Sequence, residues 1–179
     1  MFSRFVRNRL PKFNEVVPVL AVTVFMMYGW TILMFLRFLS YWLKFLNVIE
    51  ILGILSYSMV TNLLESLAIL SLLLLFCAAL PPKLLKEVFV VRGTFIVLCL
   101  LGFLMTFLNY FASVDEPFAQ IAGWSLGILL VTGLVSAFLP RLRPAALAAQ
   151  WTAENMTIFL YIFLPFTALG LILLVIRNF

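Results

Sequence analysis

Long apolar stretches alternate with short polar clusters along the chain, and this pattern predicts helices that cross a membrane. A helix needs about 20 mostly apolar residues to cross a hydrocarbon core of about 30 Å. Five stretches meet this requirement: residues 16–36, 62–80, 93–112, 118–139 and 156–176. We therefore expect five transmembrane helices, with residues 145–155 forming the start of the last one.

The apolar segment over residues 38–56 differs from these five because polar side chains recur on one face of it. Arg37, Ser40, Lys44 and Asn47 follow one another at steps of three and four, and Glu50 lies at the edge of the same stripe. Residues at this spacing share one face of a helix. The pattern predicts an interfacial amphipathic helix over about 38–56. A sixth span over residues 38–60 is the alternative.

The composition supports a membrane location. Of the 179 residues, 65% are hydrophobic and 11% are charged, whereas soluble domains are about half apolar and about a quarter charged. A soluble chain of this length buries only about 70% of its surface, which is too little to hide this excess. The expected fold is an all-α integral membrane protein, a single polytopic domain over residues 1–179 with five transmembrane helices and one interfacial helix.

The basic residues predict the orientation, because cytoplasmic loops carry an excess of Lys and Arg. The chain has 12 Lys and Arg against 7 Asp and Glu, a net charge of +5. With the N-terminus inside, the inner segments hold Arg4, Arg7, Arg9, Lys12, Lys83, Lys86, Arg92, Arg141 and Arg143, and the outer turn holds Asp115 and Glu116. A sixth span would place the basic connection after residue 80 outside. We therefore predict five spans with the C-terminus outside. Because the basic residues lie mostly at the ends of apolar stretches, we predict no nucleic-acid partner.

The residue types exclude several chemistries. The chain has no histidine, and its two cysteines, Cys77 and Cys99, lie apart within apolar stretches. This removes the commonest zinc and haem ligands and the Ser-His-Asp mechanism. Phosphate-binding, nucleophile-elbow and metalloprotease motifs are also missing from the sequence. We predict no metal site, no cofactor and no catalytic residue.

Small residues on the fourth predicted span indicate close helix packing. Gly123 and Gly127 are four positions apart, with Ala119 before them and Gly133 after them. Small residues at this spacing let two helix backbones approach closely in lipid. The interpretations are packing inside the bundle, a homodimer seam or a substrate groove. In the fifth span, Pro165 removes one backbone hydrogen bond, which predicts a bend or a hinge.

Five polar residues are candidates for binding. Asn62, Glu65 and Asn109 are expected at similar depth near the outer ends of the second and third spans, and Arg37 and Lys44 lie on the predicted interfacial helix. A carboxylate below the membrane surface is costly unless it is paired or wet. Three interpretations of Glu65 are therefore open: it reaches headgroup water, it forms an ion pair with one of the two cations, or it contributes to a ligand site. The cations fit headgroup phosphates.

The sequence therefore favours a non-catalytic subunit or scaffold of a membrane complex. Its expected partners are membrane lipids and either a partner subunit or a second copy, bound through the Gly123 and Gly127 face. One alternative is a small transporter or channel component with a polar site near Glu65 and Asn109. Another is an outer-leaflet enzyme that acts on a lipid or a lipid-linked substrate.

Overall fold

The computed structural model describes residues 10–82, 85–111 and 118–178, which contain helices and no strand. The five long helices are α2 (Phe13–Trp42), α3 (Val48–Ala79), α4 (Phe89–Phe111), α5 (Phe118–Phe138) and α6 (Arg143–Asn178). Two short 3-10 turns, η1 (Lys86–Val88) and η2 (Leu139–Arg141), precede α4 and α6. All five long helices are long and apolar enough to cross a membrane. The all-α prediction and the helix count are confirmed.

The prediction of a separate helix over residues 38–56 is wrong. Phe38 belongs to the last turn of α2, residues 43–47 form a turn, and α3 begins at Val48 and continues without a break to Ala79. The backbone N–H of Asn47 donates to Oε2 of Glu50 at 2.8 Å. Asn followed three residues later by Glu is a helix-start signal of the capping-box type. The apparent polar stripe therefore joins the end of one helix to the start of the next.

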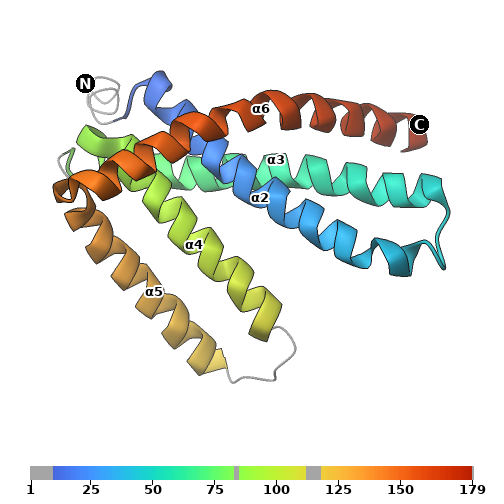
Figure 1. The fold of residues 1–179 in the computed structure, drawn as a ribbon, viewed down its shortest axis with the longest axis horizontal. Coiled ribbons are helices and arrows are strands. Elements are labelled where there is room, and N and C mark those ends of the chain that lie inside the picture. Colours follow the sequence, from blue (N-terminus) through green and yellow to red (C-terminus); the bar gives the residue numbers. More distant parts are fainter. Residues whose placement is uncertain (1–9, 83–84, 112–117, 179) are drawn as a thin grey trace.

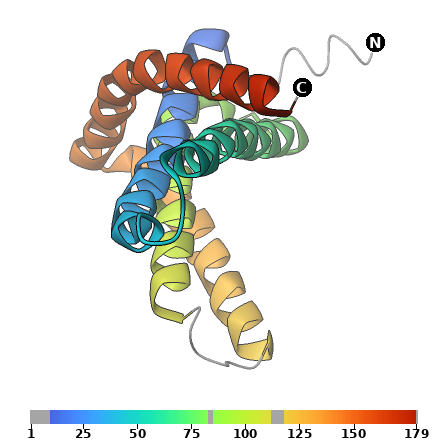
Figure 2. The same ribbon diagram turned by 90° about the vertical axis from the view of Figure 1, so that its right-hand side faces the viewer.

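The helices gather at one end of the molecule and spread apart toward the other (Figure 1). Helices α2, α3 and α6 run along the long axis, while α4 and α5 form a hairpin that diverges from them. The rotated view also shows this hairpin extending away from the other three helices (Figure 2). The start of α2 and the end of α6 lie toward opposite ends of the long axis (Figure 1).

Helix α2 lies at the centre of the fold. It packs against α3, α4 and α6, and its consecutive residues Ala21, Val22, Thr23 and Val24 are at most 1% exposed. Four consecutive side chains point in all directions around a helix, so this turn of α2 is buried on every side. Helix α5, by contrast, packs mainly on α4 and on the η2 turn among the described elements.

Helices α3 and α6 approach closely through small residues. A Cβ atom added to Gly170 would lie 3.4 Å from the backbone oxygen of Ser56, and one added to Gly53 would overlap the guanidinium of Arg177. Neither glycine was singled out from the sequence. Their pairing depends on the register between residues that are 114 and 124 positions apart in the sequence, which no local pattern reveals.

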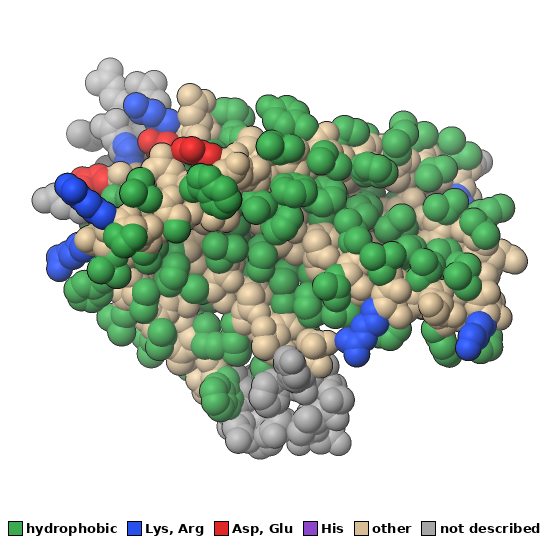
Figure 3. Space-filling view, in the orientation of Figure 1, with side chains coloured by type: hydrophobic (Ala, Val, Ile, Leu, Met, Phe, Trp, Pro, Cys, Tyr) green, Lys and Arg blue, Asp and Glu red, His purple; other side chains and the backbone are tan. Residues whose placement is uncertain are grey.

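The charged side chains lie mainly at the end where the helices gather. On the face shown in Figure 3, the middle of the molecule carries hydrophobic and neutral side chains, and most charged groups lie at the end that contains the N-terminus. The described cations of this end include Lys86, Arg92, Arg141 and Arg143, which lie on or beside the α3–α4 and α5–α6 connections. The predicted acidic turn at Asp115 and Glu116 lies outside the described residues.

Candidate functional site

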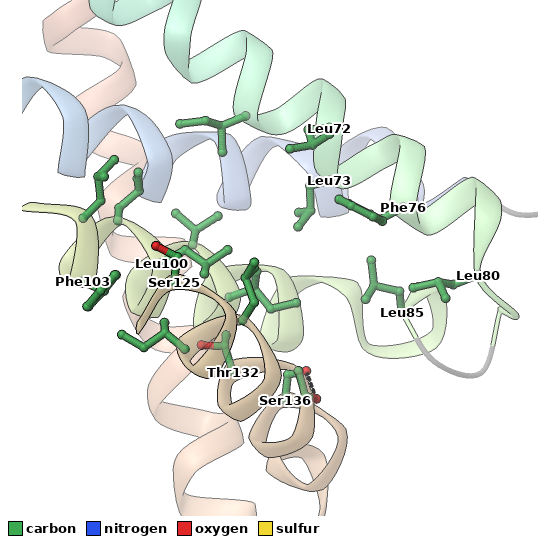
Figure 4. A pocket seen from close by; sticks show the side chains of 18 residues that line it. Leu72, Leu73, Phe76, Leu80, Leu85, Leu100, Phe103, Ser125, Thr132 and Ser136 are labelled. Carbon is green, nitrogen blue, oxygen red and sulfur yellow. Dashed lines mark hydrogen bonds between the residues drawn. The ribbon is translucent and has the colours of Figure 1, made fainter. Parts of the chain in front are cut away.

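An apolar groove lies between the C-terminal half of α3 and the α4–α5 hairpin. Its volume is about 620 Å³, which falls in the range of ligand-binding pockets. The close-up shows side chains from all three helices pointing into it (Figure 4). Most of its wall is apolar, and it includes Ile69, Leu72, Phe76, Leu100, Phe103 and Leu129.

Three hydroxyl groups from α5 interrupt this apolar wall. Ser125, Thr132 and Ser136 line the groove at steps of seven and four, which places them on one side of the helix. Ser136 donates to the carbonyl oxygen of Gly133 at 2.8 Å, so its hydroxyl is satisfied by its own helix (Figure 4). The groove wall carries no charged side chain that could take part in a reaction. It suits a hydrophobic ligand.

The small residues of α5 divide between two faces. Gly133 lines the large groove, whereas Gly123 and Gly127 line a shallow depression on another side of α5, together with Trp124 and Val131. A Cβ added to any of these three glycines would meet nothing within 4 Å. Within the described residues, no other helix therefore fills the small-residue face. Ala119 lies in α5, and its side chain is outside the described set.

Two of the predicted binding residues contact each other. Arg37, near the end of α2, donates through Nη1 to Oδ1 of Asn109 on α4 at 3.0 Å. Both residues are exposed. The contact joins the C-terminal parts of α2 and α4 across 72 positions.

Asn62 lies in a different environment, inside the α2–α3 interface. It is 5% exposed, and its Oδ1 accepts a hydrogen bond of 3.0 Å from Thr31 Oγ1. Its Nδ2 atom is buried and makes no hydrogen bond in the described part of the chain. A residue held in this way serves helix packing, and it is withdrawn from the surface where Arg37 and Asn109 meet.

Glu65 and Lys44 are separated from both contacts. Glu65 is exposed on α3, and Lys44 is exposed in the turn between α2 and α3. Neither side chain makes an ion pair with another described residue. The structure therefore does not bring the five candidate residues together into one polar site.

Pro165 lies inside α6, and the helix continues on both sides of it from Arg143 to Asn178. Its position leaves the carbonyl of Tyr161 without the usual backbone donor. Tyr161 is 78% exposed, so this part of α6 faces outward and not toward the groove.

The described residues contain no group of three or more Cys, Asp or Glu side chains that could hold a metal ion. The sequence does not predict the groove, because its lining residues belong to uniformly apolar helices. A signal did exist on α5, where three hydroxyl residues recur on a single face.

Comparisons with protein-family models, with curated proteins and with solved structures find no match to this chain.

Proposed function

We propose that this chain is a multi-pass integral membrane protein that acts as a non-catalytic subunit of a membrane complex. In this proposal the N-terminus is inside, the C-terminus is outside, and a transmembrane helix of a partner subunit binds along α5. The chain contributes packing surfaces to the complex, and a partner contributes any chemistry.

The observation that carries the proposal is the unfilled small-residue face of α5. Gly123 and Gly127 leave a depression walled by Trp124 and Val131, and a Cβ at either glycine would meet nothing within 4 Å. In lipid, helices associate through close packing and not through the hydrophobic effect. A small-residue notch stabilises such an association when the backbone of another helix packs into it.

The large residues beside the notch extend the same surface. Leu130, Val131 and Leu134 are each at least 60% exposed, and they lie one to two turns beyond Gly127 on the same side of α5. A partner helix would contact this surface over most of the length of α5. The dispersed positions of the five polar candidates give the transporter and enzyme alternatives less support.

The test compares two glycines of α5. Gly127→Leu fills the notch, while Gly133→Leu makes the same change on the groove side and serves as the matched control. The proteins are extracted from their own membrane in a mild detergent and sized by native electrophoresis. We expect the wild type and Gly133→Leu to migrate in a complex, and Gly127→Leu to migrate as a 20.4 kDa chain with bound detergent.

Two differently tagged copies, expressed together, identify the partner class. Co-isolation of the two tags would assign the notch to a second copy, and its absence would assign the complex to a different subunit. A wild-type protein that is monomeric under all extraction conditions would refute the proposal, as would a Gly127→Leu variant that stays in the wild-type complex.

A further inference from the structure

The groove between α3, α4 and α5 has the chemistry of a site for hydrocarbon chains. Its wall is formed by side chains such as Leu72, Phe76, Leu100 and Leu129, and several of these, including Leu72 and Phe76, are more than half exposed. In the bilayer location proposed above, on which this inference rests, the groove faces lipid and not water. Hydrocarbon therefore has free access to it.

The length of the groove matches the hydrocarbon part of one lipid leaflet. Its wall extends from Ile69 on α3 to Leu80 just after that helix, and from Ser125 to Ser136 on α5. At a rise of 1.5 Å per residue, each of these walls is about 16 Å long. That length equals about half of a hydrocarbon core of about 30 Å, which is the depth of one leaflet.

The end of the groove determines which leaflet supplies the lipid. Leu80 and Leu85 lie at that end, beside the α3–α4 connection, and Ser136 lies close to the α5–α6 connection (Figure 4). The described charges on these two connections are Lys86, Arg141 and Arg143 against the single acid Glu87, and Arg92 follows near the start of α4. Cations at a membrane surface attract anionic headgroups.

Arg141 and Arg143 are the best-placed cations for a headgroup. Both are exposed, and the guanidinium carbon of Arg141 lies 5.4 Å from the centre of the Phe138 ring. This contact keeps the cation at the end of α5, at the level where the groove stops. A phosphate at this level would place its acyl chains alongside the groove wall.

We propose that the groove binds the acyl chains of an anionic phospholipid from the leaflet on the cationic side, with the phosphate held at the α5–α6 connection by Arg141 and Arg143. The three α5 hydroxyls line the path of the chains. This site differs from the Gly123 and Gly127 notch: the two depressions are adjacent on α5 and share Ile128, but neither notch glycine lines the groove.

The test uses purified, delipidated protein in detergent, titrated with dioleoylphosphatidylglycerol and with dioleoylphosphatidylcholine, and followed by native mass spectrometry. The two lipids share their acyl chains and differ in headgroup charge. We expect one phosphatidylglycerol to bind each chain more tightly than phosphatidylcholine. Equal binding of the two lipids by the wild type would overturn the anionic assignment.

Variants then test the groove and the cations separately. Gly133→Leu adds a side chain at the groove wall, at a position where a Cβ would meet nothing within 4 Å. We expect it to abolish the bound lipid, whereas Gly127→Leu should retain it. Each of Arg141→Gln and Arg143→Gln should weaken phosphatidylglycerol about five-fold and leave phosphatidylcholine unchanged. Lys44→Gln and Arg177→Gln, which neutralise cations outside these connections, are the charge controls.

The outcome is independent of the complex described above. A chain that is monomeric but binds phosphatidylglycerol would refute the partner helix and support the lipid site. Wild-type affinity in Gly133→Leu would refute the lipid site, whatever the state of the complex. Thermal unfolding of each variant in the same detergent confirms that a lost lipid does not reflect a lost fold.

Discussion

The phenol oxygen of Tyr28 on α2 and the hydroxyl oxygen of Thr167 on α6 lie 2.5 Å apart, although 139 positions separate the two residues. The same phenol donates to the carbonyl oxygen of Met59 on α3 at 2.9 Å. Its ring stacks on Phe163, with a centroid distance of 4.7 Å. Tyr28 is 0% exposed, so one side chain of the central helix joins the three helices that run along the long axis.

Removing only the hydroxyl should have a small effect. Hydrogen bonds between helices in a membrane contribute about 0.6 kcal/mol on average, so we expect Tyr28→Phe to destabilise the protein by about 1 kcal/mol. Tyr28→Ala also removes the ring and leaves a cavity, at a cost of about 3–5 kcal/mol. Unfolding in mixed micelles with increasing dodecyl sulfate measures both values. Equal losses for the two variants would show that the hydrogen bonds, and not ring packing, dominate.

Two glycines of α4 should respond in opposite directions to the same substitution. A Cβ at Gly93 would lie 3.2 Å from both methyl groups of Val19, whereas a Cβ at Gly102 would meet nothing within 4 Å. Overpacking costs about 1–3 kcal/mol, and alanine favours a helix over glycine by about 1 kcal/mol. Gly93→Ala should therefore lower the unfolding free energy, and Gly102→Ala should raise it or leave it unchanged.

The thermal midpoint in detergent distinguishes the two glycine variants. A higher thermal midpoint for Gly93→Ala would contradict the tight α2–α4 contact at this position. It would mean that α4 can shift away from α2 without a loss of stability.

The contact between Arg37 and Asn109 should appear as a coupling energy. Both residues are exposed, and exposed pairs that involve a charge contribute about 1 kcal/mol or less. Arg37→Gln, Asn109→Ala and the double variant form a double-mutant cycle, measured by unfolding in mixed micelles. We expect a coupling of about 0.5 kcal/mol. Strictly additive losses would show that the 3.0 Å hydrogen bond contributes nothing to stability.

The proposed orientation predicts which turns a membrane-impermeant thiol reagent can reach. In a variant without Cys77 and Cys99, we expect Lys44→Cys to react in intact cells, because the α2–α3 turn is then outside. Leu142→Cys, in the α5–α6 connection, should react only after the membrane is opened. Reversed labelling would invert the orientation, and labelling of both positions from the same side would contradict the number of spans between them.

The sequence predicts most helix ends and misses one pair. Pro81 and Pro82 follow α3, and Pro140 follows α5, close to the predicted ends at residues 80 and 139. A proline in a helix interior removes a backbone hydrogen bond, so helices end before it. The polar stripe predicts an interfacial helix across the α2–α3 junction, whereas the hydrogen bond between Asn47 and Glu50 shows that these two residues begin α3.

The candidate site is harder to predict than the helix ends, because two residues of the same type can lie in different environments in the fold. Asn62 and Asn109 were grouped by depth, yet Asn62 is buried against Thr31 and Asn109 lies exposed against Arg37. Gly127 and Gly133 were grouped by spacing, yet they line different depressions on α5. Depth along a helix follows from counting residues, whereas the direction of a side chain depends on which neighbour lies there.

The sequence by itself determined the number of long apolar helices, because helix length and apolarity are local properties of the chain. Only the tertiary structure decided that α2 is central, that α5 is peripheral, and that a groove lies between α3, α4 and α5. The physical reason is that lipid is as apolar as a leucine side chain. A helix surrounded by lipid and a helix surrounded by other helices can therefore have the same composition on every face, and no hydrophobic stripe marks the faces that pack together.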